Sequence, residues 1–430
     1  MKKFGFLIFC ILCLTSSLQA AGDGFVSLFN GRNLDGWVNV NCALETWTVR
    51  DGMIICTGIP TGVLRTEKQY ENYVLELQWR HMKKRGNAGL FIHSDPVTAV
   101  GKPFTRSIEI QIMDGNAGDM FSIHGATMTP DKPHPKGWVR SFPSEDRMNP
   151  TGQWNHYRIE SRNGTATLAV NGKIVTRGFH LNPRKGYICL ESEGSEVHFR
   201  NIRIRELPGT NPPADVVAQK DQGFRCLYNG LDLRGFRQPE GHEGHWQAKN
   251  WILDYDGKSR AKDKNLWTEE EFGNFILIVD WRLPNKPKID NVPIVLPDGS
   301  EATDADGKPL TVAVMDAGDS GIYLRGESKS QVNIWNWPVG SGEIWGYRKD
   351  VNMSPEVRRG ATPILNADNP VGQWNRFEIT AIGETVTIAL NGKTVIRNTR
   401  LPGLPERGPI ALQHHGDHVQ FANIYIKELD

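Results

Sequence analysis

The chain has 430 residues, which is too long for one ordinary hydrophobic core and indicates two or three domains. Its formal net charge of +1 argues against a nucleic-acid or anionic-membrane partner, because both attract strongly basic surfaces. The 44 glycines and 25 prolines punctuate short apolar runs, as in many strands joined by tight turns. The composition therefore predicts an all-β protein.

The first 21 residues have the pattern of a signal peptide. Lys2 and Lys3 precede the apolar stretch 4–14, and small and polar residues follow up to Ala21. The apolar stretch is too short for a transmembrane segment, and no later stretch is long enough. We expect residues 1–21 to be removed on export, which predicts a periplasmic or secreted protein. Lipid attachment at Cys13 is the alternative.

Four cysteines follow the predicted signal peptide, at positions 42, 56, 189 and 226. An even number of cysteines in an exported chain permits disulfides, and Cys42 and Cys56 are the closest pair in sequence. Alternatively, all four are reduced and buried as small apolar residues. The sequence leaves the two states open.

Six sequence blocks occur twice in the same order, about 200–230 residues apart, which indicates a tandem repeat. We predict a first domain at 22–208, a linker at 209–220 and a second domain at 221–430. Prolines and a glycine within 208–213 prevent a strand from continuing there. The second copy has about 30 extra residues between Arg282 and Asp319, and the first has about ten between Ser94 and Glu109. The repeated blocks are 29–37, 79–80, 87–91, 152–155, 171–173 and 199–207, which return as 228–236, 281–282, 319–323, 372–375, 391–393 and 421–429.

The sequence pattern predicts several strands within each copy. Segments 73–79 and 108–112 alternate apolar and polar residues, the period of a strand with one buried face. Segments 165–170 and 174–175 flank Asn171-Gly172, a dipeptide that fits a tight hairpin, and Asn391-Gly392 repeats it. About a dozen such segments per copy predict two concanavalin A-like jelly-roll β-sandwiches in tandem.

The candidate catalytic residues of the first copy lie on one strand and around it. Glu109 and Gln111 share a strand face, and Asp114 follows at the strand end. Two carboxylates beside a sugar ring can divide acid and base roles if their environments separate their pKa values. An ordinary solvated strand face is the alternative. Further side chains that could line the same bowl are His93, His124, His134, Trp138 and Glu191.

The aligned strand of the second copy has amides in place of the carboxylates, with Gln331 for Glu109 and Asn336 for Asp114. Amides bind hydroxyl groups but do not transfer protons at neutral pH. Trp335 and Trp337 are two residues apart, so they either form a stacking platform for sugar rings or belong to the core. The remaining predicted sugar-binding side chains of this copy are Gln331, Asn333, Arg325, Glu343 and His414. A divalent metal ion held by His414, His415 or His418 with Glu343 is an open alternative.

These residues resemble the 3-keto-disaccharide hydrolase family, also described as 3-keto-glucoside 1,2-lyase and 3-keto-2-hydroxy-glucal hydratase. The resemblance implies a substrate already oxidised to a ketone at sugar C3. The ketone acidifies the C2 proton, a base removes it, the C1 substituent leaves with help from an acid or a metal, and water adds to the glycal. The motifs that carry the resemblance are 28–37, 87–93, 109–114, 154–155, 171–172 and 190–202 in the first copy, and 227–236, 319–325, 331–336, 374–375, 391–392 and 412–424 in the second.

The two copies depart from the family pattern in complementary ways. The first keeps Glu109 and Asp114 but has His93 where the family has arginine. The second keeps Arg325 and the run 413–415 but lacks the carboxylates. We therefore expect the first copy to transfer protons and the second either to bind an oligosaccharide or glycoside or to contribute across an interface. A non-catalytic, lectin-like carbohydrate-binding protein is the main alternative, since this fold serves both roles.

Overall fold

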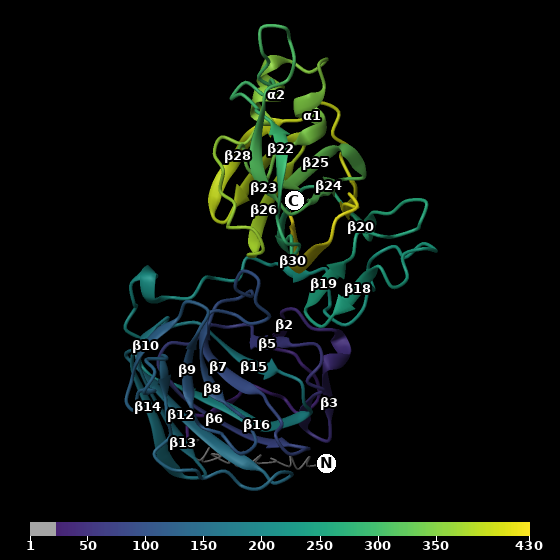
Figure 1. The fold of residues 1–430 in the computed structure, drawn as a ribbon. Helices are drawn as coiled ribbons and strands as arrows, with labels where there is room; N and C mark the ends of the chain where they lie inside the picture. The colour runs from purple at the N-terminus through teal and green to yellow at the C-terminus, as the bar shows by residue number, and fades with distance from the viewer. Residues whose placement is uncertain (1–22) are drawn as a thin grey trace, which may run out of the picture.

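The computed structural model describes residues 23–430, so the predicted signal peptide lies outside the described residues. Two β-sandwiches follow one another along the chain and form the purple-to-teal and the green-to-yellow lobes of Figure 1. Both are antiparallel sandwiches of the concanavalin A-like jelly-roll type, which confirms the predicted fold class. No helix in this part of the chain is long and apolar enough to cross a membrane.

The first sandwich packs a nine-stranded sheet against a seven-stranded sheet. The nine-stranded sheet contains, in spatial order, β10 (Thr127–Pro130), β14 (Lys173–Asn182), β13 (Thr165–Val170), β12 (Asn155–Arg162), β6 (Tyr73–His81), β16 (Val197–Glu206), β4 (Met53–Cys56) and β3 (Trp47–Arg50), with β1 (Val26–Ser27) beside β16. The seven-stranded sheet contains β11 (Arg140–Ser141), β9 (Met120–Ile123), β8 (Ser107–Gln111), β7 (Gly89–Ser94), β15 (Tyr187–Ser192), β5 (Gly62–Thr66) and β2 (Trp37–Asn39).

The second sandwich packs an eight-stranded sheet against a four-stranded sheet. The eight-stranded sheet contains β18 (Trp246–Lys249), β19 (Ile252–Tyr255), β30 (Val419–Glu428), β21 (Phe275–Arg282), β26 (Asn375–Ile382), β27 (Thr385–Leu390) and β28 (Lys393–Arg400), with β17 (Arg225–Cys226) beside β30. The four-stranded sheet contains β20 (Leu266–Phe272), β29 (Gly408–Leu412), β24 (Asp319–Leu324) and β25 (Glu327–Trp335). The remaining elements are the hairpin β22 (Lys288–Pro293) and β23 (Thr311–Asp316), the helices α1 (Trp345–Lys349) and α2 (Pro355–Gly360), and the 3-10 turns η1 (Leu44–Thr46) and η2 (Ala214–Val216).

The alternation of apolar and polar residues explains why these strands pair as they do. In β6, Leu75, Leu77 and Trp79 lie in the core between the sheets, while the intervening polar side chains remain partly exposed. The predicted hairpin is confirmed, because β13 and β14 pair across Asn171 and Gly172. Both turn residues have positive φ, 47° and 88°, as a tight two-residue turn requires.

An apolar cluster joins the two sandwiches. Val63, Phe91 and Cys189 lie on the outer face of the seven-stranded sheet and pack with Ile278 and Tyr425 from the outer face of the eight-stranded sheet. All five side chains are buried. The second domain therefore covers part of the sheet face on which the first domain carries its predicted site.

The loop 95–106 contains the predicted insertion of the first copy. It forms hydrogen bonds across this interface. The Thr98 and Tyr425 hydroxyls lie 2.9 Å apart, and the Gly101 amide donates to Asp280 Oδ2 at 2.8 Å. Arg376 pairs with Asp280, with 2.6 Å between Nε and Oδ1, and donates to the Thr98 carbonyl at 3.0 Å. Polar groups buried between the domains thus have partners in the other domain, as buried polar groups require.

The predicted linker runs along the first sandwich. The Ala218 amide donates to the Lys185 carbonyl at 2.7 Å, and the Gln219 amide donates to Asp95 Oδ1 at 2.9 Å. These backbone and side-chain contacts hold the segment between the two domains in a defined path.

The four cysteines are free thiols, so the open question of disulfides is decided in favour of the reduced form. Burial raises the pKa of Cys56 and of Cys189 to about 12. Buried, protonated thiols are poor nucleophiles, so these cysteines act as packing residues.

Candidate functional site

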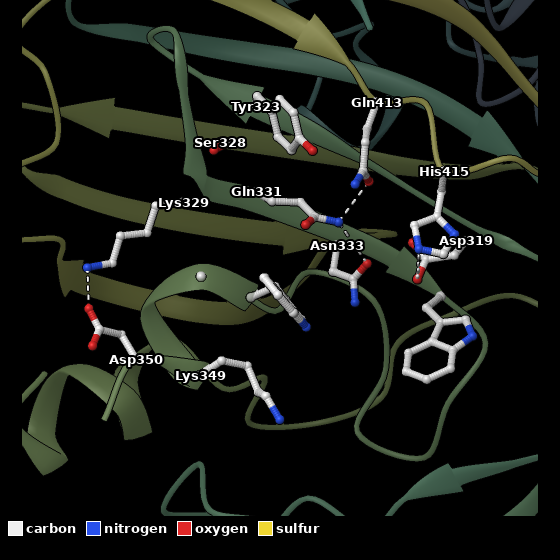
Figure 2. Close-up of a pocket in the computed structure, with 13 residues that line it drawn as sticks. Asp319, Tyr323, Ser328, Lys329, Gln331, Asn333, Lys349, Asp350, Gln413 and His415 are labelled. Atoms are coloured by element: carbon white, nitrogen blue, oxygen red, sulfur yellow. Dashed lines mark hydrogen bonds and ion pairs between the residues drawn. The ribbon is translucent and has the colours of Figure 1, made fainter. Parts of the chain in front are cut away.

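A cleft of about 690 Å³ lies on the outer face of the four-stranded sheet, and Figure 2 shows the side chains around it. Strands β24 and β25 and the residues after β29 form its floor, and α1 forms one wall. Its volume is in the range of small-molecule sites, roughly 300–1,000 Å³. The residues that line it are Asp319, Tyr323, Ser328, Lys329, Gln331, Asn333, Trp335, Trp345, Gly346, Lys349, Asp350, Gln413 and His415.

Strand alternation places the floor residues. Val332 and Ile334 of β25 belong to the core, so Gln331, Asn333 and Trp335 face the cleft. The structure therefore brings together three of the side chains predicted to bind sugar.

The floor is a hydrogen-bonded set of amides. Gln331 Nε2 donates to Gln413 Oε1 at 2.8 Å and to Asn333 Oδ1 at 3.3 Å, as the dashed lines in Figure 2 show. Beneath them is Gly321, where a Cβ would come within 2.8 Å of Gln331 and 2.9 Å of Gln413. Only glycine lets the amides lie this close to the strand, and the amides offer both donors and acceptors to hydroxyl groups.

An acid and an imidazole meet at one end of the cleft. Asp319 Oδ2 lies 3.8 Å from His415 Nε2, and His415 Nδ1 lies 3.6 Å from Asp417 Oδ2. Burial raises the pKa of Asp319 to about 7, and the Asp417 carboxylate beside it raises the pKa of His415. Asp319 Oδ1 is buried without a hydrogen-bond partner among the described residues. Asp319 therefore changes protonation near neutral pH, as general acids and bases do, and its neighbour His415 is biased toward the imidazolium.

Trp335 and Trp337 lie in different environments. Their ring centroids are 4.8 Å apart and their planes are inclined by 31°. Trp335 lines the cleft, with its Nε1 donating to Asp316 Oδ1 at 3.1 Å, whereas Trp337 is only 3% exposed. Trp335 is thus available to a sugar ring and Trp337 supports it from the interior.

Two ammonium groups lie at the α1 end of the cleft, where Figure 2 shows them well separated from His415. Lys329 pairs with Asp350 at 2.6 Å, and Lys349 pairs with Glu301 at 2.7 Å. The cleft therefore combines positive charge at one end with an acid and an imidazole at the other.

Glu343 lies beneath the floor and does not line the cleft. It forms a buried ion pair with Arg348, and Asn333 Nδ2 donates to its Oε2 at 3.4 Å. This corrects the prediction that Glu343 binds substrate, because the carboxylate acts by holding Asn333 in place.

His93 and Arg325 point into the protein interior, which corrects the predictions of a catalytic and a substrate-binding role. His93 is the penultimate residue of β7, and Arg325 directly follows β24. Their φ values of 55° and 51° break the alternation of the strand at these residues. Arg325 is 1% exposed and donates to the carbonyls of Gly273, Gly383 and Pro405 at 2.8, 2.6 and 3.0 Å. His93 is fully buried, and burial lowers its pKa to about 4. Both side chains therefore stabilise the fold.

His415 lines the cleft, whereas His414, which was predicted to bind sugar, does not. The Nδ1 atom of His414 lies 2.5 Å from the Tyr255 hydroxyl, and His414 does not line the cleft. His415 does, because the alternation of β29 continues from Gln413 to His415. The spacing of two between Gln413 and His415 is the signal that would have identified it.

The equivalent face of the first domain carries a carboxyl cluster. Glu109 and Glu191 are 9% and 1% exposed, and a Cβ on Gly89 would lie 2.4 Å from Glu191 Oε2. Burial and the charge of Glu193 raise the pKa of Glu109 to about 8. Burial and the charge of Glu109 also raise the pKa of Glu191. Gln111, also predicted to bind substrate, is buried on the same strand.

Asp114 is engaged in closing a loop. Its Oδ2 accepts from the Arg85 amide at 2.9 Å, and its Oδ1 accepts from the Thr151 hydroxyl at 2.9 Å. β8 ends at Gln111, so Asp114 lies beyond the strand on which it was expected. These two hydrogen bonds indicate a structural role for Asp114.

His124 and Trp138 lie at other places on the first domain. His124 stacks with Phe104 of the interdomain loop, at 6.4 Å between centroids, and burial lowers its pKa to about 4. Trp138 is 58% exposed and stacks on His134 at 4.3 Å. With Asp114 and His93 engaged elsewhere, the predicted catalytic set does not assemble, and the candidate site moves to the second domain.

The donor groups do not form a metal site. Between residues 23 and 430, no group of three or more His, Cys, Asp or Glu side chains is arranged to hold a metal ion. Glu343 pairs with Arg348, and His418 Nε2 lies 2.8 Å from Asp254 Oδ1. The side chains considered for a metal are therefore engaged with other partners.

The fold and the cleft define a protein of two jelly-roll sandwiches with an open polar cleft on the second. A family model described as the 3-keto-alpha-glucoside-1,2-lyase-like domain matches residues 24–205 and 223–427, one match on each sandwich. The chain therefore belongs to this family and contains two tandem copies of its domain.

Individual relatives match about one domain each. A 3-keto-disaccharide hydrolase of Bacteroides thetaiotaomicron is 22% identical over 239 residues, which is 44% of this chain and 81% of the relative. A protein named provisionally as a glycosyl hydrolase, from Parabacteroides distasonis, has 24% identity and a TM-score of 0.35, covering 43% of this chain and 94% of its own. A carbohydrate binding module from Bacillus subtilis has 12% identity and a TM-score of 0.30, covering 40% and 96%.

Proposed function

We propose that this protein cleaves 3-keto-glycosides and that the cleft of the second domain holds the keto-sugar. The observation that carries the proposal is the pair of Asp319 and His415 beside a floor of amides. Trp335 supplies an aromatic wall for a pyranose ring. Membership of the family supports a carbohydrate substrate. The Bacteroides relative is a 3-keto-disaccharide hydrolase, which supports a ketone at C3.

The chemistry assigns one proton transfer to each group. The C3 ketone acidifies the C2 proton, the Asp319 carboxylate removes it, and the electrons of the C–H bond form an enolate. The enolate then expels the C1 oxygen, which takes a proton from the His415 imidazolium. Water adds across the resulting glycal, its hydroxyl to C1 and a proton to C2, so the overall change is hydrolysis. The N–H groups of the floor amides provide donors for the enolate oxygen.

The test compares a glucoside with its 3-keto derivative, using the wild type, Asp319→Asn and Glu109→Gln. We expect cleavage of the keto compound alone and a fall in kcat of at least about 100-fold for Asp319→Asn, since general-base catalysis contributes roughly 10²–10⁴. Because the pKa of Asp319 is about 7, kcat/KM should rise with pH through that value and fall again where the His415 imidazolium loses its proton.

Glu109→Gln is the matched control, because it also replaces a buried carboxyl of raised pKa by its amide. It should leave kcat within about twofold of the wild type. The opposite ranking of the two variants would return proton transfer to the first domain. Binding of the keto-glycoside without any cleavage would favour the lectin-like alternative.

A further inference from the structure

Two carboxylates lie on opposite sides of the His415 imidazole. Asp319 Oδ2 lies 3.8 Å from Nε2, and Asp417 Oδ2 lies 3.6 Å from Nδ1. Asp319 and His415 line the cleft, whereas Asp417 does not. The Asp417 carboxylate therefore lies beside the imidazole from outside the cleft, on the ring nitrogen that does not face Asp319.

Asp417 is itself held in a defined place. Its Oδ2 accepts from the Asp319 backbone amide at 3.0 Å. The neighbouring segment passes it at Gly318, which has a φ of 123° and on which a Cβ would lie 2.6 Å from the Cβ of Asp417. One carboxylate thus contacts both members of the acid and imidazole pair, the first through its backbone and the second through its ring.

The orientation of the His415 ring depends on its charged neighbours. The side chain is 51% exposed and lies beyond the end of β29, so packing restrains it little. The charged groups that face it are the carboxylates of Asp319, Asp417 and Asp316, and Lys288 lies near Asp417 in turn. Asp319 is the proposed base and Asp316 accepts a hydrogen bond from an indole, so Asp417 is the carboxylate that remains for the imidazole.

The first domain keeps the backbone contact of Asp417 without its charge. In the repeat, the equivalents of Asp319, His415 and Asp417 are Asn87, Glu193 and Ser195. The Asn87 backbone amide donates to Ser195 Oγ at 2.8 Å, as the Asp319 amide donates to Asp417. A serine is therefore sufficient to hold this backbone. The carboxylate occurs in the copy that also has the imidazole, which indicates that its charge serves His415.

We propose that Asp417 is the positioning residue for His415: it orients the imidazole with Nε2 toward the cleft and balances its positive charge until that nitrogen donates its proton to the leaving oxygen. The inference rests on the proposed function, which makes His415 the general acid. Because Nδ1 faces Asp417, the imidazolium gives its Nε2 proton to the C1 oxygen and keeps its Nδ1 proton. When water adds to the glycal, its hydroxyl bonds to C1, its other proton returns to Nε2, and Asp319 returns a proton to C2.

The first experiment follows the titration of His415 without any substrate. Proton–carbon NMR records the ring signals, and His415→Gln identifies the signal that belongs to this residue. The pKa of His415 should be lower in Asp417→Ser and in Asp417→Asn than in the wild type, because both variants remove a carboxylate that favours the imidazolium. Asp417→Ser introduces the residue of the first domain, and Asp417→Asn takes its place if the serine variant does not fold. An unchanged titration in the folded variant would overturn the positioning role.

Asp256→Ser is the matched control. Asp256 is another carboxylate of this domain beside an imidazole, with 3.0 Å between its Oδ2 and His245 Nδ1, and neither residue lines the cleft. This variant should leave the pKa of His415 and the rate of cleavage as in the wild type. A fall in the pKa of His415 as large as that in Asp417→Ser would show that the effect does not come from the carboxylate beside the ring.

The second experiment measures kcat/KM for a 3-keto-glucoside as a function of pH. In Asp417→Ser the alkaline limb, which His415 sets, should move to lower pH. At the wild-type optimum kcat/KM should fall at least about tenfold, since general acid catalysis contributes roughly 10²–10⁴. A fall at every pH with the limb in place would mean a merely structural role and sink the inference. If the wild type cleaves no keto-glycoside but the pKa of His415 still falls in Asp417→Ser, the proposed function fails and the support of the imidazole by Asp417 stands.

Discussion

Glu109 and Gln331 occupy the same position in the repeat, and both are almost excluded from water. Only the glutamate can ionise, and burial together with the charge of Glu193 raises its pKa to about 8. In the second domain the amide is neutral at every pH and pairs with Gln413 at 2.8 Å. Glu109 and Gln331 thus occupy equivalent places in their sheets. Only Glu109 can ionise, and burial makes that ionisation unfavourable.

This difference predicts a pH-dependent gain in stability for Glu109→Gln. The unfolded glutamate loses its proton near its usual pKa of about 4.3, whereas the folded one keeps it up to about 8, so wild-type stability falls as pH rises between these values. Glutamine has no proton to lose. We expect equal stability at pH 4 and a gain of roughly 1–3 kcal/mol for the variant at pH 8.5, measured by urea unfolding. The exposed Glu67→Gln should show no such trend, and equal stabilities at pH 8.5 would contradict the burial argument.

Arg325 shows how one side chain ties several elements together. It follows the end of β24, and its guanidinium reaches the Gly273 turn between β20 and β21 and the Gly383 turn between β26 and β27. These turns belong to both sheets of the second sandwich. The residue therefore closes one end of the sandwich by satisfying carbonyls that would otherwise be buried without a donor.

Arg325→Met should accordingly lower stability and spare activity. Loss of the guanidinium leaves several buried carbonyls unpaired, which we expect to cost about 3–5 kcal/mol in the free energy of unfolding. KM and kcat, measured well below the melting temperature, should stay within about twofold. Arg407→Met, at an exposed arginine nearby, is the control. A raised KM with unchanged stability would instead restore the substrate-binding role.

A loop of the first sandwich is buried against the second. Gly101 lies at the centre of this contact, with a φ of 60°, and a Cβ on it would be 2.1 Å from the Trp374 ring. The buried pair of Asp280 and Arg376 depends on the same loop. Opening the interface would expose apolar residues of both domains and leave these charges without their partners from the loop.

Gly101→Val should therefore uncouple the domains. We expect one calorimetric transition for the wild type and two for the variant, because the added side chain forces the loop away from Trp374. Gly172→Val is the matched control: this glycine also has a positive φ, 88°, but open space around it, so the control reports backbone strain alone. Two transitions in the control, or one in Gly101→Val, would show that the clash at the interface is not the cause.

Much of the fold could be predicted from the chain because its signals are local. Alternation in segments such as 73–79, the Asn171-Gly172 turn and the repeated blocks define two sandwiches without reference to distant contacts. The same alternation correctly placed Gln331, Asn333 and Trp335 on one open face. It failed at His93 and Arg325, where a left-handed residue at the strand end turns the side chain inward.

Which of the two equivalent faces remains open was decided only by the tertiary structure. Val63 and Phe91 lie on an outward face in the first domain, and they are buried because Ile278 and Tyr425, far away in sequence, pack against them. No local pattern encodes that docking, since it depends on the path of the linker and on the loop 95–106. The sequence alone determined the two copies and the faces of their strands. The packing of one copy on the other left the cleft, and with it the acid and imidazole of Asp319 and His415, on the second.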